Sequence, residues 1–245
     1  MQANYKYKYA VVQDLYDTYV NADYDIKFWV SECKKSKEVL ELTAGTGRVT
    51  IPLAKAGIEV TALDISKEVL THLKAKAKRA KVKIKTIEAD MRSFDLKRKF
   101  PLIIIPFQSI QELTSDHEAC LRQVKKHLED NGRFIVTMHN ENRENRIAGK
   151  YVLPKSRKKI LFSTKRTYNQ KTQLGTAFQT YEEYDKKGNL ISKKQFKNSY
   201  YVFRKGEFEA LAKKCGFRIK NLYGDYSRRE FEANSPFRIY ELTKC

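Results

Sequence analysis

Long apolar runs are absent from this sequence of 245 residues. No stretch approaches the ~20 consecutive apolar residues that cross a membrane as a helix. The first ten residues, MQANYKYKYA, contain no apolar segment that could serve as a secretion signal. We therefore predict that the protein has no membrane span and is cytoplasmic.

Cysteine and histidine are scarce, with four residues of each type. The cysteines are scattered and form no CxxC pair, so reduced thiols are the simplest interpretation. The segment HEAC at residues 117–120 lacks the second histidine of the zinc-binding HExxH pattern. We predict no metal site.

Basic residues are in excess, since 49 lysine and arginine residues stand against 29 aspartate and glutamate residues, a net charge of +20. Residues 151–220 hold 18 of the basic residues and 5 of the acidic ones, and KAKAKRAKVKIK at 74–85 is a second basic cluster. Such an excess can attract phosphates, acidic proteins or a membrane surface. It is equally typical of solvated helix and strand faces, and both interpretations stay open.

The composition, with 41 % hydrophobic and 32 % charged residues, is that of a globular protein. Two helices are expected within residues 8–35, and Ser66 has the properties of a helix N-cap. After residue 35, strand-like and helix-like segments alternate. This rhythm predicts an α/β fold with a doubly wound, mostly parallel sheet. The expected strands lie at residues 38–42, 59–64, 83–90, 100–107 and 133–139, the last one entered through a turn at Asn131–Gly132.

The alternation stops after His139. Three segments rich in β-branched and aromatic residues, separated by NQKTQ and KKGN, predict an antiparallel meander of three strands. A helix at 205–216 and two further strands follow. We therefore divide the chain into N-terminal helices or a lid (1–36), an α/β core (37–140), a β insertion (141–203) and a C-terminal helix and hairpin (204–245).

The turn after the first strand contains Gly45 and Gly47, which allow a ligand to approach the backbone at the start of a helix. Glu41, Asp64 and Asp90 stand at or near the ends of three strands, where an open α/β sheet binds its ligand. Three carboxylates suit a ligand with hydroxyl and amino groups better than one with a pyrophosphate. A dinucleotide stays possible, although Thr50 replaces the third glycine of GxGxxG.

These segments resemble the class I S-adenosylmethionine-dependent methyltransferases. VLELTAGTGRVTIPLAKAG is similar to their first motif, ALDIS to the second-strand acid and IEADMRSFDL to the adenine-contacting segment. PFQSIQEL and LRQVKKHLEDNGRFIVTM resemble the region of the fourth and fifth strands, and the C-terminal segment resembles their terminal hairpin. The resemblance implies a seven-stranded Rossmann-like sheet with an antiparallel last strand. Within the superfamily, an insertion after the fifth strand is similar to that of small-molecule and sugar-amine N-methyltransferases.

The resemblance also implies the positions that hold S-adenosylmethionine. Glu41 and the turn Ala44, Gly45, Thr46 and Gly47 would face the methionine moiety. Asp64 would accept both ribose hydroxyls, Ile65 and Met91 would flank the adenine, Asp90 would accept its amino group, and Phe107 would form pocket wall.

Two positions depart from the family pattern. Thr43 replaces the first motif glycine, and its β-branched side chain predicts a less tight turn. Glu112 stands where the sugar-amine enzymes often have histidine. We predict Glu112 as the general base, with His139 as the second candidate. Tyr16 would close over the cofactor, where its ring face could stabilise the sulfonium.

The function predicted from the sequence is methyl transfer to a nitrogen or oxygen of a small molecule, with the insertion shaping the acceptor site or a homodimer contact. The basic insertion makes RNA or a ribonucleoprotein the alternative acceptor. A cofactor-binding scaffold without activity and a dehydrogenase are the remaining alternatives.

Overall fold

The computed structural model describes residues 23–140, 151–152 and 159–245. The helix expected before residue 23, and with it Tyr16, lies outside the described residues.

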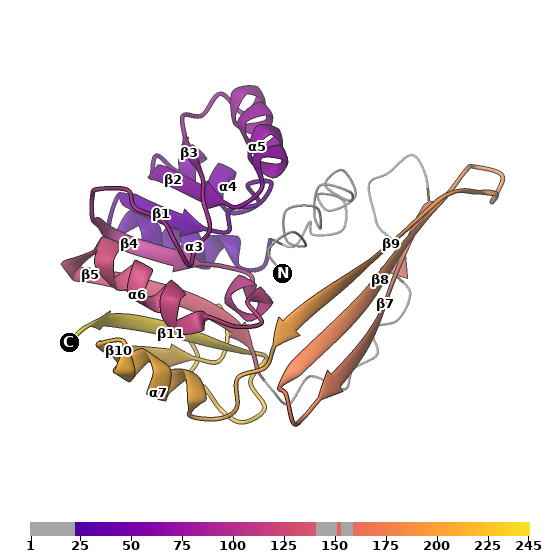
Figure 1. The fold of residues 1–245 in the computed structure, drawn as a ribbon. Coiled ribbons are helices and arrows are strands. Elements are labelled where there is room, and N and C mark those ends of the chain that lie inside the picture. The colour runs from indigo at the N-terminus through magenta and orange to yellow at the C-terminus, as the bar shows by residue number, and fades with distance from the viewer. Residues whose placement is uncertain (1–22, 141–150, 153–158) are drawn as a thin grey trace.

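A seven-stranded sheet with the order β10-β11-β5-β4-β1-β2-β3 forms the core (Figure 1). β1 to β5 pair in parallel, whereas β11 pairs antiparallel with both β5 and β10. The predicted fold class, including the antiparallel last strand, is confirmed. The strands are β1 Glu38–Leu42, β2 Glu59–Asp64, β3 Lys85–Glu88, β4 Phe100–Ile105, β5 Leu128–His139, β10 Phe217–Tyr223 and β11 Phe237–Lys244.

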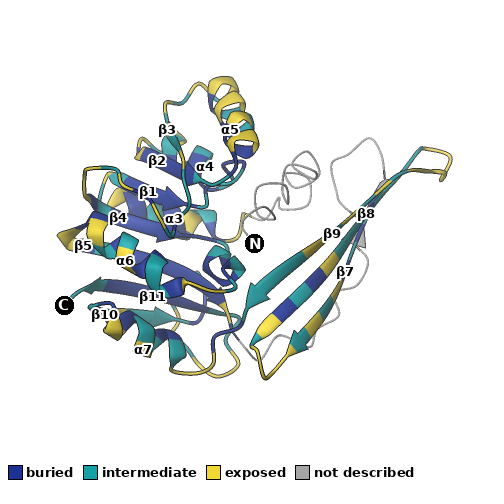
Figure 2. Cartoon of the chain, in the orientation of Figure 1, coloured by how far each residue is buried: buried dark blue, intermediate teal, exposed yellow. Residues whose placement is uncertain are grey.

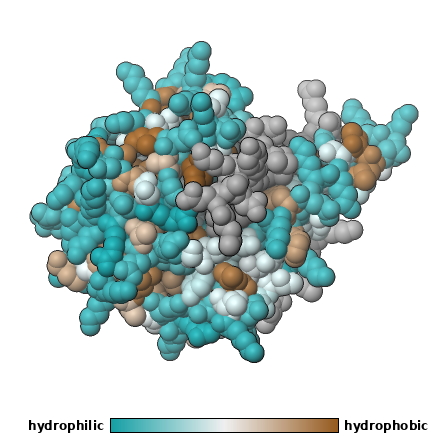
Figure 3. Space-filling model, viewed as in Figure 1, coloured by the Kyte–Doolittle hydropathy of each residue, from teal (hydrophilic) through white to brown (hydrophobic). Residues whose placement is uncertain are grey.

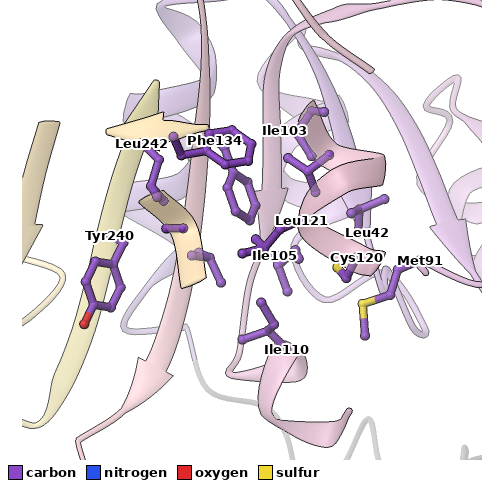
Figure 4. Packing of buried hydrophobic residues seen from close by; sticks show 14 of the residues in the cluster. Leu42, Met91, Ile103, Ile105, Ile110, Cys120, Leu121, Phe134, Tyr240 and Leu242 are labelled. Atoms are coloured by element: carbon purple, nitrogen blue, oxygen red, sulfur yellow. The ribbon is translucent and has the colours of Figure 1, made fainter. Parts of the chain in front are cut away.

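Helices cover both faces of this sheet because its strands are apolar on both sides. β4 is typical: Ile103 and Ile105 belong to one hydrophobic cluster, and Leu102 and Ile104 belong to the other. The first cluster includes residues of α6 (His117–His127) and α7 (Glu207–Lys214), and Figure 4 shows Leu121 of α6 beside Ile105. The second includes residues of α3 (Ile26–Lys34), α4 (Thr50–Lys55) and α5 (Lys67–Arg79). Ser66 caps α5 as predicted, since its hydroxyl accepts a hydrogen bond from the Val69 N–H at 3.2 Å.

A second, antiparallel sheet with the order β6-β7-β8-β9 stands beside the core (Figure 1). β7 Lys159–Asn169, β8 Leu174–Tyr184 and β9 Leu190–Tyr201 are the three predicted meander strands, and the two-residue β6 Tyr151–Val152 was not predicted. Buried and exposed positions alternate along β8 (Figure 2), as expected for a sheet with one covered face. We call this sheet the insertion sheet.

Two local predictions were wrong. Asn131–Gly132 is not a turn before a strand but part of β5, which begins at Leu128. The pairing of β5 with β4 shifts register opposite Pro101, which has no N–H to donate and so favours a bulge there. Asp90 does not end a strand either, because β3 stops at Glu88. The chain turns at Asp90, whose carbonyl accepts the Ser93 N–H at 2.9 Å.

Among the described residues, no helix is long and apolar enough to cross a membrane.

Candidate active site

A cavity of about 360 Å³ lies between the carboxyl ends of the core strands and the insertion sheet. This volume is typical of a small-molecule site. The core contributes one wall, which we call the core wall, and the insertion sheet contributes the other, which we call the insertion wall. The core wall includes Thr43, Gly45, Thr46, Asp64, Ile65, Asp90, Met91, Phe107, Gln108, Gln111, Glu112 and His139. The insertion wall includes Arg166, Ala177, Gln179, Tyr181, Asn198 and Tyr200.

The turn between β1 and α4 forms the part of the core wall nearest to β1. Thr43, Gly45 and Gly47 all have positive φ, at 60°, 56° and 87°. Thr43 therefore adopts the left-handed conformation despite its β-branched side chain, and its hydroxyl donates to the Leu42 carbonyl at 2.5 Å. This local bond accompanies the left-handed conformation that glycine would otherwise supply, and the less tight turn stays a prediction.

Asp64 connects this turn to the end of β2. One carboxylate oxygen accepts the Gly45 N–H at 2.8 Å, and the other accepts the Ser66 N–H at 3.0 Å. Burial raises the pKa of Asp64, although these two backbone donors act in the opposite direction. The nearby charge of Glu112 raises the pKa of Asp64 further, which indicates that the two carboxylates face a common space.

Asp90 lines the cavity beside Met91, and Ile65 lines it from the end of β2. The Arg92 guanidinium donates to the Asp90 carboxylate at 2.6 Å, and the Arg92 N–H does so at 2.8 Å. Burial raises the pKa of Asp90, but these bonds from Arg92 outweigh it, so the net shift is downward. Asp90 is therefore a fixed and ionised hydrogen-bond acceptor.

Glu41 does not line the cavity. Leu40 and Leu42 point into the cluster that contains α6 and α7, so the alternation of β1 turns the Glu41 side chain toward the opposite face. There the carboxyl is buried and accepts a hydrogen bond from the Thr50 hydroxyl at 2.6 Å. Burial raises the pKa of Glu41 to about 8. Ala44 and Gly47 also lie outside the cavity lining, whereas Gly45 and Thr46 belong to it.

Glu112 and His139 both line the cavity, and Gln111 connects the segments that carry them. Glu112 ends the short helix η1 Ser109–Glu112, and His139 ends β5. The side-chain carbonyl of Gln111 accepts the His139 N–H at 2.8 Å, and its amide group donates to the Tyr201 carbonyl at 3.3 Å. Sequence reasoning missed Gln111, whose place between Ile110 and Glu112 in SIQEL gives no distinctive signal.

Phe107 and Gln108 form a strained segment before η1. Both have positive φ, at 55° and 60°, and both line the cavity. The Arg48 guanidinium lies 4.5 Å from the centre of the Phe107 ring and is paired with the buried Asp25. Strain of this kind costs about 1–3 kcal/mol per residue and is common at functional sites.

The sequence predicted that the insertion shapes the acceptor site or a homodimer contact, but it identified no single residue of the insertion wall. Its cavity-lining positions on β8 are Ala177, Gln179 and Tyr181, which follow a period of two. That period was readable in the sequence, but which face would be covered was not. Tyr24 also lines the cavity.

No group of three potential metal-ligating side chains occurs in the part of the chain that the structure describes.

Residues 39–132 match the family described as methyltransferase domain. YqeM of Bacillus subtilis, which carries a methyltransferase name, is 21 % identical over 88 % of both chains. A dTDP-3-amino-3,4,6-trideoxy-alpha-D-glucopyranose N,N-dimethyltransferase of Streptomyces venezuelae is 29 % identical over 54 % of this chain and 57 % of its own length.

The solved structure of an S-adenosylmethionine-dependent methyltransferase from Clostridium acetobutylicum has a similar fold. It superposes with a TM-score of 0.80 at 19 % identity, and the match covers 96 % of this chain and 98 % of that one. The similarity in fold therefore extends over the insertion sheet as well as the core.

Proposed function

We propose that this chain, a class I S-adenosylmethionine-dependent methyltransferase, transfers a methyl group to an amine nitrogen of a small polar molecule. S-adenosylmethionine is its cofactor. The amine is favoured over a hydroxyl acceptor by the similarity to an amino-sugar N,N-dimethyltransferase. A carboxylate in the core wall, Glu112, adds support because it is suited to take a proton from an ammonium group.

The main support for this proposal is that one cavity is lined by residues of both sheets. The acceptor would occupy a space closed by the insertion wall rather than an open groove, and a volume of about 360 Å³ suits a small molecule. A wall that carries Arg166, Gln179 and Asn198 suits a polar one.

The core wall has the chemistry that the cofactor needs. Asp64 and Asp90 offer carboxylate oxygens for ribose hydroxyls and an amino group, and Ile65 and Met91 offer apolar contacts for a flat base. Gly45 leaves the space beside its Cα open, since an added Cβ would meet no atom within 4 Å. We assign the cofactor to these residues and to Thr46, with Phe107 as pocket wall.

Glu41, Ala44 and Gly47 would stabilise the conformation of the turn without contacting the cofactor. Tyr16 keeps its predicted role as a residue that closes over the cofactor. Bound S-adenosylmethionine supplies a methyl group that is already activated by its sulfonium sulfur. The residues of this chain therefore have to align the acceptor, exclude water and remove a proton.

Calorimetry with S-adenosylhomocysteine tests the cofactor assignment. Asp64→Ala removes the hydroxyl-binding carboxylate and the acceptor for the Gly45 N–H, so we expect the affinity to fall about ten- to hundredfold. Glu59→Ala, at the exposed start of the same strand, is the matched control and should bind as the wild type does. Equal affinities of the Asp64→Ala variant and the wild type would show that this carboxylate does not hold the cofactor.

Incubation with methyl-labelled cofactor tests the acceptor class. The label should move to amine-containing fractions of a small-molecule extract. Label found only in RNA, or only in compounds without an amine, would contradict the proposal.

A further inference from the structure

The two walls of the cavity differ in charge. The core wall carries the carboxylates of Asp64, Asp90 and Glu112, whereas the described residues that line the insertion wall include no carboxylate. Among these described lining residues, Arg166 is the charged one. A positive charge is thus held on the side of the cavity opposite the carboxylates.

Arg166 belongs to the covered face of the insertion sheet. Thr164 and Phe162, two and four residues earlier on β7, are buried, and the intervening Lys165 is exposed. Across the strands, Arg166 pairs with Ala177 of β8, and Ala177 pairs with Asn198 of β9. The small side chain of Ala177 therefore separates a guanidinium from an amide in one row, and all three residues line the cavity.

The Arg166 guanidinium lacks the partners that other enclosed arginines of this chain have. Arg48 pairs with Asp25, and Arg133 pairs with Glu32 and Glu241. Within the described residues, Arg166 forms no ion pair, and its Nε atom is buried without a hydrogen-bond partner. Burying this N–H without an acceptor is costly, so a ligand that supplies acceptor oxygens to the guanidinium would offset the cost.

We propose that Arg166 is an anion-binding residue of the acceptor site. The acceptor would carry a carboxylate or phosphate group at its end remote from the methyl-accepting atom. That group binds the Arg166 guanidinium, and the Asn198 amide lies within the same row. The acceptor is thereby oriented with its amine toward the core wall. This inference rests on the proposed function, because it assumes that the acceptor occupies this cavity.

The test uses inorganic phosphate and acetate as probes for the two anion sources. Each is titrated calorimetrically, at constant ionic strength, into the full chain saturated with S-adenosylhomocysteine. Arg166→Met removes the charge, and Lys165→Met removes the same charge from the exposed face of the same strand. We expect the wild type and the Lys165→Met variant to bind at least one probe, and the Arg166→Met variant to bind it about ten- to hundredfold more weakly. Arg166→Lys, which keeps the charge without the fork of donors, should lie between them.

The preferred probe identifies the anion. Tighter binding of phosphate indicates a phosphorylated acceptor, and tighter binding of acetate indicates a carboxylate. Equal binding by the wild type and the Arg166→Met variant, an equal loss in the Lys165→Met variant, or no binding of either probe by the wild type would overturn the proposal. The affinity for S-adenosylhomocysteine distinguishes a failure of this proposal from a failure of the proposed function. If every variant binds S-adenosylhomocysteine as the wild type does, only the role of Arg166 is contradicted and the proposed methyltransferase site is not.

Discussion

Glu112 and His139 lie on the same wall of the cavity, but their surroundings differ. Glu112 is half-buried at the end of η1, whereas His139 is exposed and its ring stacks on Phe237 with 5.9 Å between ring centres. A partly enclosed carboxylate that shares the cavity with Asp64 is better placed for proton transfer than an exposed ring held against an aromatic side chain. At the residue scale we therefore keep Glu112 as the first candidate for the base.

Replacing Glu112 by Gln keeps the shape of the side chain and removes the base. We expect kcat to fall about 10²- to 10³-fold while the affinity for S-adenosylhomocysteine stays unchanged. His139→Asn is the matched comparison and should change kcat little. Steady-state rates with the identified acceptor decide between them, and the reverse ranking would assign the base to His139.

Glu41 shows that a carboxyl group near a cofactor site need not contribute charge to it. With a pKa of about 8, caused first by burial, this group is mostly protonated at neutral pH. Under the proposed function, the attraction for a sulfonium cation would come from carboxylates of the core wall such as Glu112. The sequence pattern of three acids at strand ends overstates the negative charge of the site.

At the scale of elements, Gly47 joins the β1–α4 turn to α5. Its φ is +87°, and an added Cβ would lie 2.2 Å from the Cδ1 atom of Leu73, a fully buried residue of α5. Position 47 therefore requires a residue that adopts a left-handed backbone conformation and that has no Cβ to collide with α5.

We expect Gly47→Ala to lower the free energy of unfolding by about 2–4 kcal/mol, from backbone strain and overpacking together. Gly57→Ala is the matched control, because Gly57 also has positive φ, at +79°, but an added Cβ would meet no atom within 4 Å. That variant should lose about 1 kcal/mol, from strain alone. Urea unfolding measures both, and equal losses would show that contact with Leu73 is unimportant.

At the scale of the whole molecule, Glu32 of α3 connects segments that are distant in the sequence. Its buried carboxylate accepts hydrogen bonds from Arg133 of β5 at 2.7 Å, from Arg228 near the C-terminus at 2.6 Å and from Lys35 at 2.8 Å. Burial raises the pKa of Glu32, but these bonds from Lys35, Arg133 and Arg228 outweigh it and lower the pKa to about 2.

A lowered pKa makes this contribution to stability depend on pH. The stabilisation is complete above the unfolded-state pKa of Glu32, the usual 4.5 of a glutamate, and is lost as the pH falls toward about 2. Glu32→Gln should therefore lower the free energy of unfolding at pH 7 by about 1–3 kcal/mol and flatten the curve of stability against pH between these values. Glu118→Gln, which breaks exposed ion pairs with Arg122 and Lys214, should change stability little. Urea unfolding at several pH values measures the free energy of unfolding of the three proteins. If this free energy fell equally with decreasing pH in the wild type and in Glu32→Gln, the lowered pKa of Glu32 would not be the cause of the acid loss of stability.

Exposed lysines contribute to the basic excess of the insertion sheet. Figure 3 shows a largely hydrophilic face, and Lys165, Lys193 and Lys197 of the insertion sheet are exposed. Of the lysines and arginines in the part of the chain that the structure describes, Arg166 lines the cavity. RNA binding and a homodimer through the insertion sheet stay predictions, as does the division of the chain into four segments.

The sequence by itself determined the α/β core and the glycine-containing turn after its first strand. Both depend on local signals: apolar strands such as Phe100–Ile105, the N-cap Ser66, and glycines that permit the turn after β1. These signals act within a few residues of the chain, so they can be read without knowing what packs against them.

Only the tertiary structure decided which side chains reach the cavity. Strand alternation turned Glu41 away from it, and Gln111 came to hold the ends of η1, β5 and β9 together. Likewise, the covered face of the insertion sheet, which carries Arg166, was fixed by its packing opposite the core. The contacts of Gln111 and Arg133 join residues up to 90 and 108 positions apart, and no local sequence pattern specifies contacts of that range.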